Sequence, residues 1–447
     1  MGSKSRHLIN RGTPILCVFV AGWAAVGSAQ EGPVPKGIPH LDHVFVIMME
    51  NHGYDQIFNN QNAPFINQLA HSGNQATNYF AVGHPSLTNY LEVVGGSNFG
   101  IRSDHDPDWH NPLCRANIMS GVTATERPRG AVCPIAGIGT DAETPARDCT
   151  NEVQIPDSQP ERCYYDLDGT LLVPSAPTVG KSIADQLVER GKTWKSYQED
   201  LPPSGADRVN FSDGFLTDTT DFTNLLPLWA PFKRLSTDTI TMVRKVDSPA
   251  QARADIVQLY GVKHNPFAYF RNVQEGGDPR NSLRNVVGFD GSDGLFADLA
   301  SNNLPNFSFI APNQCNDHHG RDNAGAFCNY DSPGHDGKPS GLNGAVIRRG
   351  DIAVQRIVTA IKDSPAWRKG NNVIVLLWDE NDFSATPNHV LLIVDKSYGD
   401  EGFQSNRFYT HFSLLKSLEA GFGLPCLNHA CDSSADIMSD LFRSSTH

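Results

Sequence analysis

Four short apolar runs constrain the fold of this chain most strongly. They are residues 41–49 (LDHVFVIMM), 306–311 (NFSFIA), 372–378 (NVIVLLW) and 389–394 (HVLLIV). Each is nearly continuous in apolar residues and does not alternate with polar ones. This pattern is typical of strands that are covered on both faces, as in a parallel sheet. The runs therefore predict a mostly parallel sheet between two layers of other structure.

Helical patterns lie between and after these runs. Residues 179–191, 350–362 and 409–422 carry apolar side chains at helical spacing, and the first of them ends on Gly191. Strands that alternate with helices predict an α/β fold, here a three-layer sandwich.

One stretch interrupts this order. Residues 98–177 are rich in Pro, Gly, Asp and Cys and show little periodicity. The stretch is too long for a plain loop. We expect a disulfide-stapled insertion within a single domain that spans residues 30–447.

The N-terminus has the features of a secretory signal. Lys4, Arg6 and Arg11 precede an apolar run at residues 14–26, and small residues follow at 27–29. The run is shorter than the roughly 20 residues that a membrane-spanning helix needs. We expect a signal peptide at residues 1–29, no stable membrane span, and secretion to the periplasm or the cell exterior.

The cysteines support export. Of nine cysteines, Cys17 lies in the expected signal peptide, and an even set of eight remains. Such a set in an exported chain is typical of four disulfides. Cys315 can pair locally with Cys328, and Cys426 with Cys431. The chain lacks a C-x-x-C pair, which argues against a zinc–cysteine site.

The net charge of −13 argues against nucleic acid as a partner, because phosphate backbones attract basic surfaces. It does not argue against a small phosphate ester, because a bound metal can dominate the local field. Sequons at Asn210 and Asn306 could carry sugar in a host that glycosylates.

Polar clusters follow the apolar runs. Glu50 and Asn51 come directly after residues 41–49, and Asp379 and Glu380 come directly after residues 372–378. In open α/β sheets, ligands bind at the carboxyl ends of the strands. Carboxylates gathered there repel one another unless a cation lies between them. The alternatives are a helix cap for Glu50 and a solvent-facing side chain for one member of the acidic pair.

A hydroxyl stands at the start of a helical stretch. Ser86, in the segment HPSLTNY, lies just before apolar residues at 90–94. A helix N-terminus favours bound phosphate through its dipole and its free N–H groups. His84 is close enough to Ser86 in sequence to act as an acid or base. Asn89 is close enough to donate a hydrogen bond to a phosphoryl group. The alternative is a plain N-cap serine.

A third cluster follows residues 306–311. Asp317, His318 and His319 share one loop, and His389 stands where the next apolar run begins. Asp and His together suit zinc or a similar ion, whereas a solvated polar loop is the alternative. Together with Ser86 and the carboxylate pairs, these residues favour metal-assisted attack on a phosphoryl group.

The motifs, in their order, resemble a secreted phosphoesterase family. They include MMENHGYDQIF, HPSLTNYLEVVGGS, KHNPFAYF, LPNFSFIAPNQCNDHH and VIVLLWDEND, and with further segments they cover most of residues 41–427. The family includes acid phosphatases and bacterial phospholipases C. Its core fold is similar to that of alkaline phosphatase. The resemblance therefore implies an alkaline-phosphatase-like sandwich and hydrolysis of phosphoric esters.

The resemblance also implies roles for single residues. Glu50 and Asn51 match a pair that binds metal and phosphate, and Asp379 with Glu380 matches the carboxylate pair that completes the metal site. Ser86 matches the nucleophile.

Other matching positions have roles that the resemblance leaves less defined. Asn89 matches a phosphate-contacting residue. Six further positions match polar positions near the centre of the site, which form a second metal site or bind phosphate directly. Either His318 or His319 could be the ligand from their loop. The six positions are His84, His264, Asp317, His318, His319 and His389. Oxygen ligands such as Glu380 leave zinc, magnesium, manganese or calcium open as the cation.

Taken with the residues above, the resemblance implies a metal-dependent phosphomonoesterase of the acid phosphatase type. The substrate would be a small phosphate ester or a phospholipid head group. A phosphodiesterase of the phospholipase C type is the near alternative. A non-catalytic secreted binding protein is a more distant one, because the nucleophile and the carboxylates are all present. A glycosidase with two carboxylates would leave Ser86 without a role.

Overall fold

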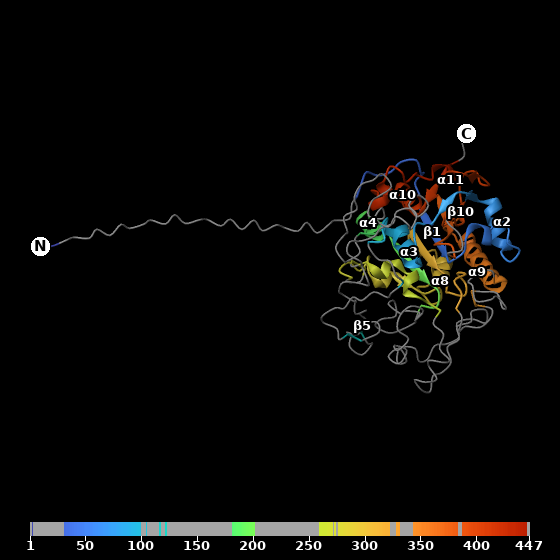
Figure 1. Ribbon diagram of the computed structural model, residues 1–447, viewed down its shortest axis with the longest axis horizontal. Helices are drawn as coiled ribbons and strands as arrows, with labels where there is room; N and C mark the ends of the chain where they lie inside the picture. The colour runs from blue at the N-terminus through green and yellow to red at the C-terminus, as the bar shows by residue number, and fades with distance from the viewer. Residues whose placement is uncertain are drawn as a thin grey trace, which may run out of the picture.

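The computed structural model in Figure 1 gives the fold of most of the chain. The structure describes residues 31–99, 181–201, 259–270, 272–273, 276–321, 328–330, 343–382 and 387–444, with residues 2, 104, 116–117 and 121–122. Apart from a few positions, the expected signal peptide and the expected insertion lie outside these residues.

A mixed, mostly parallel sheet of eight strands forms the centre of the described structure. Strand β1 (His43–Met49) lies between β8 (Phe307–Ala311) and β9 (Asn372–Trp378) and runs parallel to both. The strand order is β11-β2-β10-β9-β1-β8-β6-β7. The other strands are β2 (Asn74–Ala76), β6 (Trp194–Gln198), β7 (Val286–Val287), β10 (Leu392–Lys396) and β11 (Gln404–Ser405).

Strand β10 differs from the sequence prediction. It runs antiparallel to β9 and to β2, and it begins at Leu392 rather than at residue 389. His389 instead forms an isolated bridge with Phe80. A strand that is buried on both faces has the same continuous apolar pattern in either direction, so its sequence does not reveal the direction.

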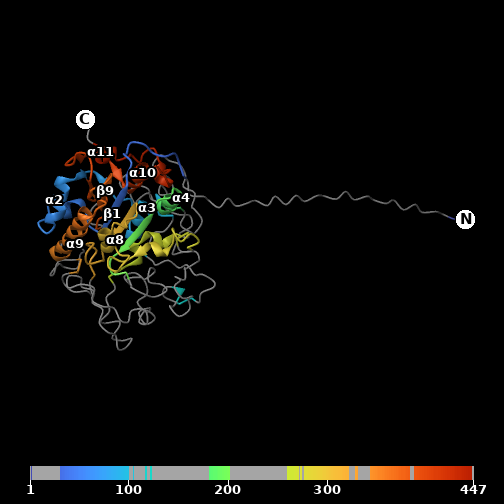
Figure 2. The ribbon, with the colours of Figure 1, turned by 180° about the vertical axis from the view of Figure 1, so that it is seen from behind.

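Helices cover both faces of the sheet, as Figures 1 and 2 show from opposite sides. On one face, α9 (Gly344–Asp363) packs against α2 (Pro64–Ser72) and α8 (Leu295–Ser301). On the other face, α3 (Ser86–Gly95) packs against α10 (His411–Phe422) and α4 (Ile183–Glu189). The predicted three-layer α/β sandwich is therefore present.

Shorter elements complete the described structure. Two small sheets pair β3 (Tyr79–Phe80) with β12 (Tyr409–Thr410) and β4 (Ala116–Asn117) with β5 (Gly121–Val122). The short helices are α1 (Tyr54–Ile57), α11 (Ser439–Phe442), η3 (Val262–His264), η4 (Pro266–Tyr269), η5 (Leu283–Asn285) and η7 (Asn428–Cys431).

Helix α9 shows why these segments are helical. Val354, Ile357 and Val358 recur at helical spacing and are buried against the sheet. The helix begins earlier than the pattern predicts, because the Asn343 side chain accepts a hydrogen bond from the amide of Ala345 and caps the N-terminus.

Two of the predicted disulfides are confirmed. Cys315 is bonded to Cys328, and Cys426 to Cys431. The other four cysteines of the expected set lie outside the described residues. Among the helices of the described residues, none is both long and apolar enough to cross a membrane.

Candidate active site

The carboxyl ends of β1 and β9 bring two carboxylates together. Met49 pairs with Trp378 in the parallel register, so Glu50 and Asp379 leave the sheet side by side. The backbone amide of Asp379 donates to the carbonyl oxygen of Met49 at 2.9 Å, and that of Asn51 donates to Asp379 Oδ1 at 3.1 Å. Asn51 has a φ of 48°, a left-handed conformation that Asn tolerates better than most residues. Both Glu50 and Asp379 are fully buried.

Ser86 lies between two of these carboxylates. It is the first residue of α3, and its Oγ is 3.0 Å from Glu50 Oε2 and 3.2 Å from Glu380 Oε1. A hydroxyl carries one proton, so it can donate to only one of the two carboxylates at a time. The other contact is favourable only if a proton or a cation also lies there.

Asn89 holds the loop before Ser86. Its Oδ1 accepts hydrogen bonds from the amides of Val82 and Gly83, both at 3.1 Å. Its Nδ2 donates to the carbonyl oxygen of Gly83 at 2.8 Å and to Glu380 Oε2 at 3.2 Å. One side chain thus fixes both the approach to the serine and the orientation of a neighbouring carboxylate.

His84 faces the same carboxylate. The side-chain amide of Asn388 donates to His84 Nε2 at 3.2 Å. Nε2 is therefore the acceptor, and the proton of the ring sits on Nδ1. Nδ1 is 2.6 Å from Glu380 Oε2. No pattern in the sequence indicates a role for Asn388, beyond its place next to His389.

His264 lies between two buried carboxylates. Its Nε2 is 3.2 Å from Glu50 Oε1, and its Nδ1 is 3.2 Å from Asp317 Oδ2. The ring of Tyr90, from α3, stacks on the imidazole with centroids 5.4 Å apart. Burial, followed by the nearby Lys263, holds the pKa of His264 well below its usual value. The ring is therefore neutral at neutral pH and links the first strand end to the loop after β8.

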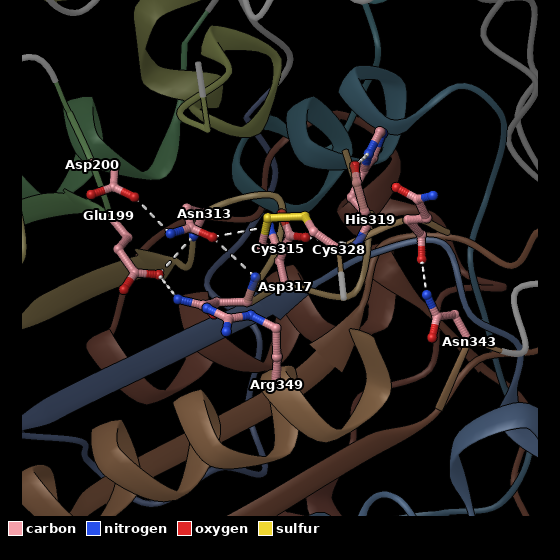
Figure 3. The surroundings of a disulfide bond; sticks show 12 residues. Glu199, Asp200, Asn313, Cys315, Asp317, His319, Cys328, Asn343 and Arg349 are labelled. Carbon is pink, nitrogen blue, oxygen red and sulfur yellow. Dashed lines mark hydrogen bonds between the residues drawn. A yellow bond between two sulfur atoms is a disulfide. The ribbon is translucent and has the colours of Figure 1, made fainter. Parts of the chain in front are cut away.

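A disulfide shapes the loop that carries Asp317, as Figure 3 shows. The loop follows β8, and Cys315 in it is bonded to Cys328. Glu199, at the end of β6, accepts hydrogen bonds from the backbone amide of Asn313 and from the side chain of Asn316. These links attach the loop to a neighbouring strand end.

The structure distinguishes the two adjacent histidines. His319 lies toward the centre, where its Nε2 is 3.1 Å from Lys263 Nζ. His318 points elsewhere, because its Nε2 is 3.0 Å from the carbonyl oxygen of Ile347 and its Nδ1 accepts from the indole of Trp378 at 3.3 Å.

His389 has a different environment from these histidines. Its ring stacks on Tyr54 with centroids 4.5 Å apart, and its Nε2 is 3.1 Å from the carbonyl oxygen of Thr77.

Two residues at the centre were not singled out from the sequence. Lys263 is buried, and its Nζ is 3.4 Å from Asp104 Oδ2. Asp104 Oδ1 also accepts from the amide of Leu87 at 3.0 Å, in the first turn of α3. The sequence predicts free N–H groups for phosphate at this helix start, but this one is already bound. The only sequence signal for Lys263 is its place next to His264.

The carboxylates leave the site short of positive charge. Burial raises the pKa of Glu50 well above its usual value, and the neighbouring Asp379 raises it further. Burial and then Glu380 act in the same way on the pKa of Asp379. Asn51 Oδ1 is buried without a hydrogen-bond donor among the residues that the structure describes. A set of oxygen ligands with this surplus of negative charge fits a divalent cation.

A second group of atoms could also hold a cation. One ligand atom from each of Glu50, His264 and His319 lies within 4.8 Å of the others, and all three side chains are buried. Glu50 belongs to both groups, so the two potential cation positions are neighbours.

Comparisons with known proteins agree with this chemistry. The model of the Phosphoesterase family matches residues 56–425. An acid phosphatase of Aspergillus fumigatus is 23% identical over 401 residues, which are 89% of this chain and 58% of that protein. A phosphatidylinositol-3-phosphatase of Mycobacterium tuberculosis is 23% identical over 415 residues, which are 92% of this chain and 87% of that protein.

The chain thus spans less than two thirds of the fungal relative. A solved structure from Vibrio parahaemolyticus, described as a protein in the alkaline phosphatase superfamily, has a TM-score of 0.40 and 12% identity over 89% of this chain and 70% of that one. That TM-score is too low to support a functional comparison. The family match, by contrast, covers most of the chain, and the chain belongs to the phosphoesterase family.

Proposed function

We propose that this protein is a divalent-cation-dependent hydrolase of phosphoric esters, of the acid phosphatase type, in which Ser86 is the nucleophile. The observation that carries the proposal is the position of Ser86 Oγ between Glu50 and Glu380, at the N-terminus of α3. Membership of the phosphoesterase family supports the reaction class.

Four residues would hold the cation: Glu50, Asn51, Asp379 and Glu380. Their oxygen atoms suit magnesium, manganese or calcium, and carboxylates also bind zinc. When bound, the cation would lower the pKa of the serine hydroxyl and offset the charge that develops on the phosphoryl oxygens.

The residues of the chain then divide the reaction between them. Ser86 Oγ attacks phosphorus while the ester P–O bond breaks, and its proton passes to the carboxylate to which it donates. The alcohol leaves with the proton that this carboxylate returns, while the Nδ1–H group of His84, 2.6 Å from Glu380 Oε2, holds Glu380 in place. Water then hydrolyses the phosphoserine to inorganic phosphate and restores the hydroxyl. The positive end of the α3 dipole favours the phosphoryl group throughout.

A phosphomonoester is the substrate class that we favour. The names of both relatives describe phosphatases, and one of them names a phosphorylated lipid head group. A phosphodiesterase of the phospholipase C type would use the same residues. We further propose that the protein is secreted, and the two described disulfides support an oxidising compartment.

A substrate panel tests this proposal. Purified protein would be stripped with a chelator, reloaded with single divalent metals, and assayed on p-nitrophenyl phosphate, bis-p-nitrophenyl phosphate and phosphatidylinositol 3-phosphate. We expect metal-dependent release of phosphate from the monoesters and little turnover of the diester. Full activity in the stripped protein would contradict the metal dependence. Preference for the diester would contradict the assignment as a phosphomonoesterase.

A further inference from the structure

We propose that Lys263 takes the place of a second metal ion. In this view its ammonium group is the resident cation of the Glu50–His264–His319 cluster, and the site binds one divalent cation per chain. The inference rests on the proposed function, because it takes the carboxylate pair of Asp379 and Glu380 as the part of the site that holds the metal.

The protonation of His319 carries the first step. His319 Nδ1 is 2.8 Å from the carbonyl oxygen of Gly320. A carbonyl oxygen only accepts hydrogen bonds, so the proton of the neutral ring sits on Nδ1 and the lone pair sits on Nε2. Lys263 Nζ is 3.1 Å from this Nε2. Lysine only donates, so the ammonium group binds the one lone pair that His319 has.

The burial of Lys263 carries the second step. Only 2% of this residue is exposed, which is uncommon for lysine and implies compensating negative charge. Asp104 supplies part of this charge at 3.4 Å. Glu50 and Asp317 lie on the two ring nitrogens of His264, the residue next to Lys263 in the chain. Lys263 is therefore close enough to offset the charge of the carboxylates around His264.

The two steps together exclude a metal from this cluster. A cation held by Glu50, His264 and His319 would need the His319 Nε2 lone pair, because Nδ1 is protonated and bound to Gly320. One lone pair cannot bind an ammonium proton and a metal at once. Two imidazoles and a carboxylate thus lie in a geometry that would suit zinc. Lys263, however, occupies the lone pair of one of these three ligands, His319.

Metal stoichiometry tests this inference. Stripped protein would be saturated with Zn²⁺, passed through a desalting column, and measured by native mass spectrometry and elemental analysis. We expect one ion per wild-type chain and two per chain of Lys263→Met. The double variant Lys263→Met with His319→Gln should return to one, because a ligand is lost. Lys263→Arg keeps the charge and should remain at one.

Lys396→Met is the matched control. Lys396 is also buried, at 5% exposure, but it donates to the carbonyl oxygens of Asp400 and Arg443, away from the site. We expect this variant to bind one ion. Two ions in the wild type, or one in a folded Lys263→Met, would overturn the inference. The wild-type count decides even if the variant does not fold, whereas a wild type that binds no ion would contradict the proposed function instead.

Discussion

Removing the disulfide beside the active site should affect activity more than it affects the stability of the whole protein. Cys315 and Cys328 are both fully buried, and their bond closes a loop with a sequence separation of 13 residues. Asp317 and His319 lie within this loop. Replacing both cysteines by alanine removes the cross-link, avoids a free thiol, and places no polar group in the buried site.

The chain-entropy relation sets the size of the effect. For a loop of this length, the cross-link contributes about 3 kcal/mol to the free energy of unfolding at 25 °C. The matched control is Cys426→Ala with Cys431→Ala. Its bond spans a sequence separation of 5 residues, for which the same relation gives about 2 kcal/mol. The two variants should therefore differ by only about 1 kcal/mol in urea unfolding curves.

Their activities should differ far more. We expect the loss of Cys315–Cys328 to lower kcat/KM at 25 °C because His264 and the carboxylates lose the fixed position of Asp317. The loss of Cys426–Cys431 should leave kcat/KM near the wild-type value wherever the protein is folded. Equal kcat/KM in the two folded variants would refute the argument that this disulfide positions the active-site loop.

Three further predictions concern single side chains. Asp379→Asn should lower the metal content and reduce kcat/KM by at least about 100-fold. Mutating a residue that only hydrogen-bonds to a metal ligand reduces activity by at most about this factor, and losing a ligand should cost more. Unchanged metal content would show that Asp379 is not a ligand. Asn89→Asp should lower the free energy of unfolding by about 1–3 kcal/mol in urea titrations, because it sets a second carboxylate against Glu380 and removes a donor to the carbonyl oxygen of Gly83; wild-type stability would contradict this. Burial, and then Asp200, raise the pKa of Glu199 from 4.5 to about 7, so its contribution to stability is present below about pH 4.5 and is lost as the pH rises through 7. Glu199→Gln should therefore show a smaller fall in unfolding free energy between these pH values than the wild type, and equal slopes would contradict the assignment.

The strand ends were the part of the site that sequence predicted best. Glu50 and Asp379 follow continuous apolar runs, and the parallel rule places such residues at one edge of the sheet. Their contact through Asn51 agrees with that reasoning. The direction of β10 could not be predicted in the same way, because burial on both faces removes the alternation that distinguishes one sheet environment from another.

The remaining parts of the site depend on contacts that no local pattern encodes. Lys263 meets Asp104 across 159 residues, and a buried lysine runs against the usual exposure of this residue type. The difference between His318 and His319 depends on the left-handed backbone of His318, whose φ is 88°. A loop sequence with two adjacent histidines does not reveal which ring turns toward the carboxylates.

The central claim is that Ser86 becomes phosphorylated during turnover. The most direct measurement is a rapid acid quench of the metal-loaded enzyme with a ³²P-labelled phosphomonoester, followed by proteolysis and mass spectrometry. We predict a phosphate on the peptide that carries Ser86, absent from Ser86→Ala. That variant should keep its fold, because Ser86 is not the N-cap of α3 and a side-chain hydrogen bond contributes only about 1 kcal/mol net, but it should lose several orders of magnitude in kcat. A Ser86→Ala enzyme with most of its activity, and no labelled Ser86 in the wild type, would contradict the account and make water the attacking group.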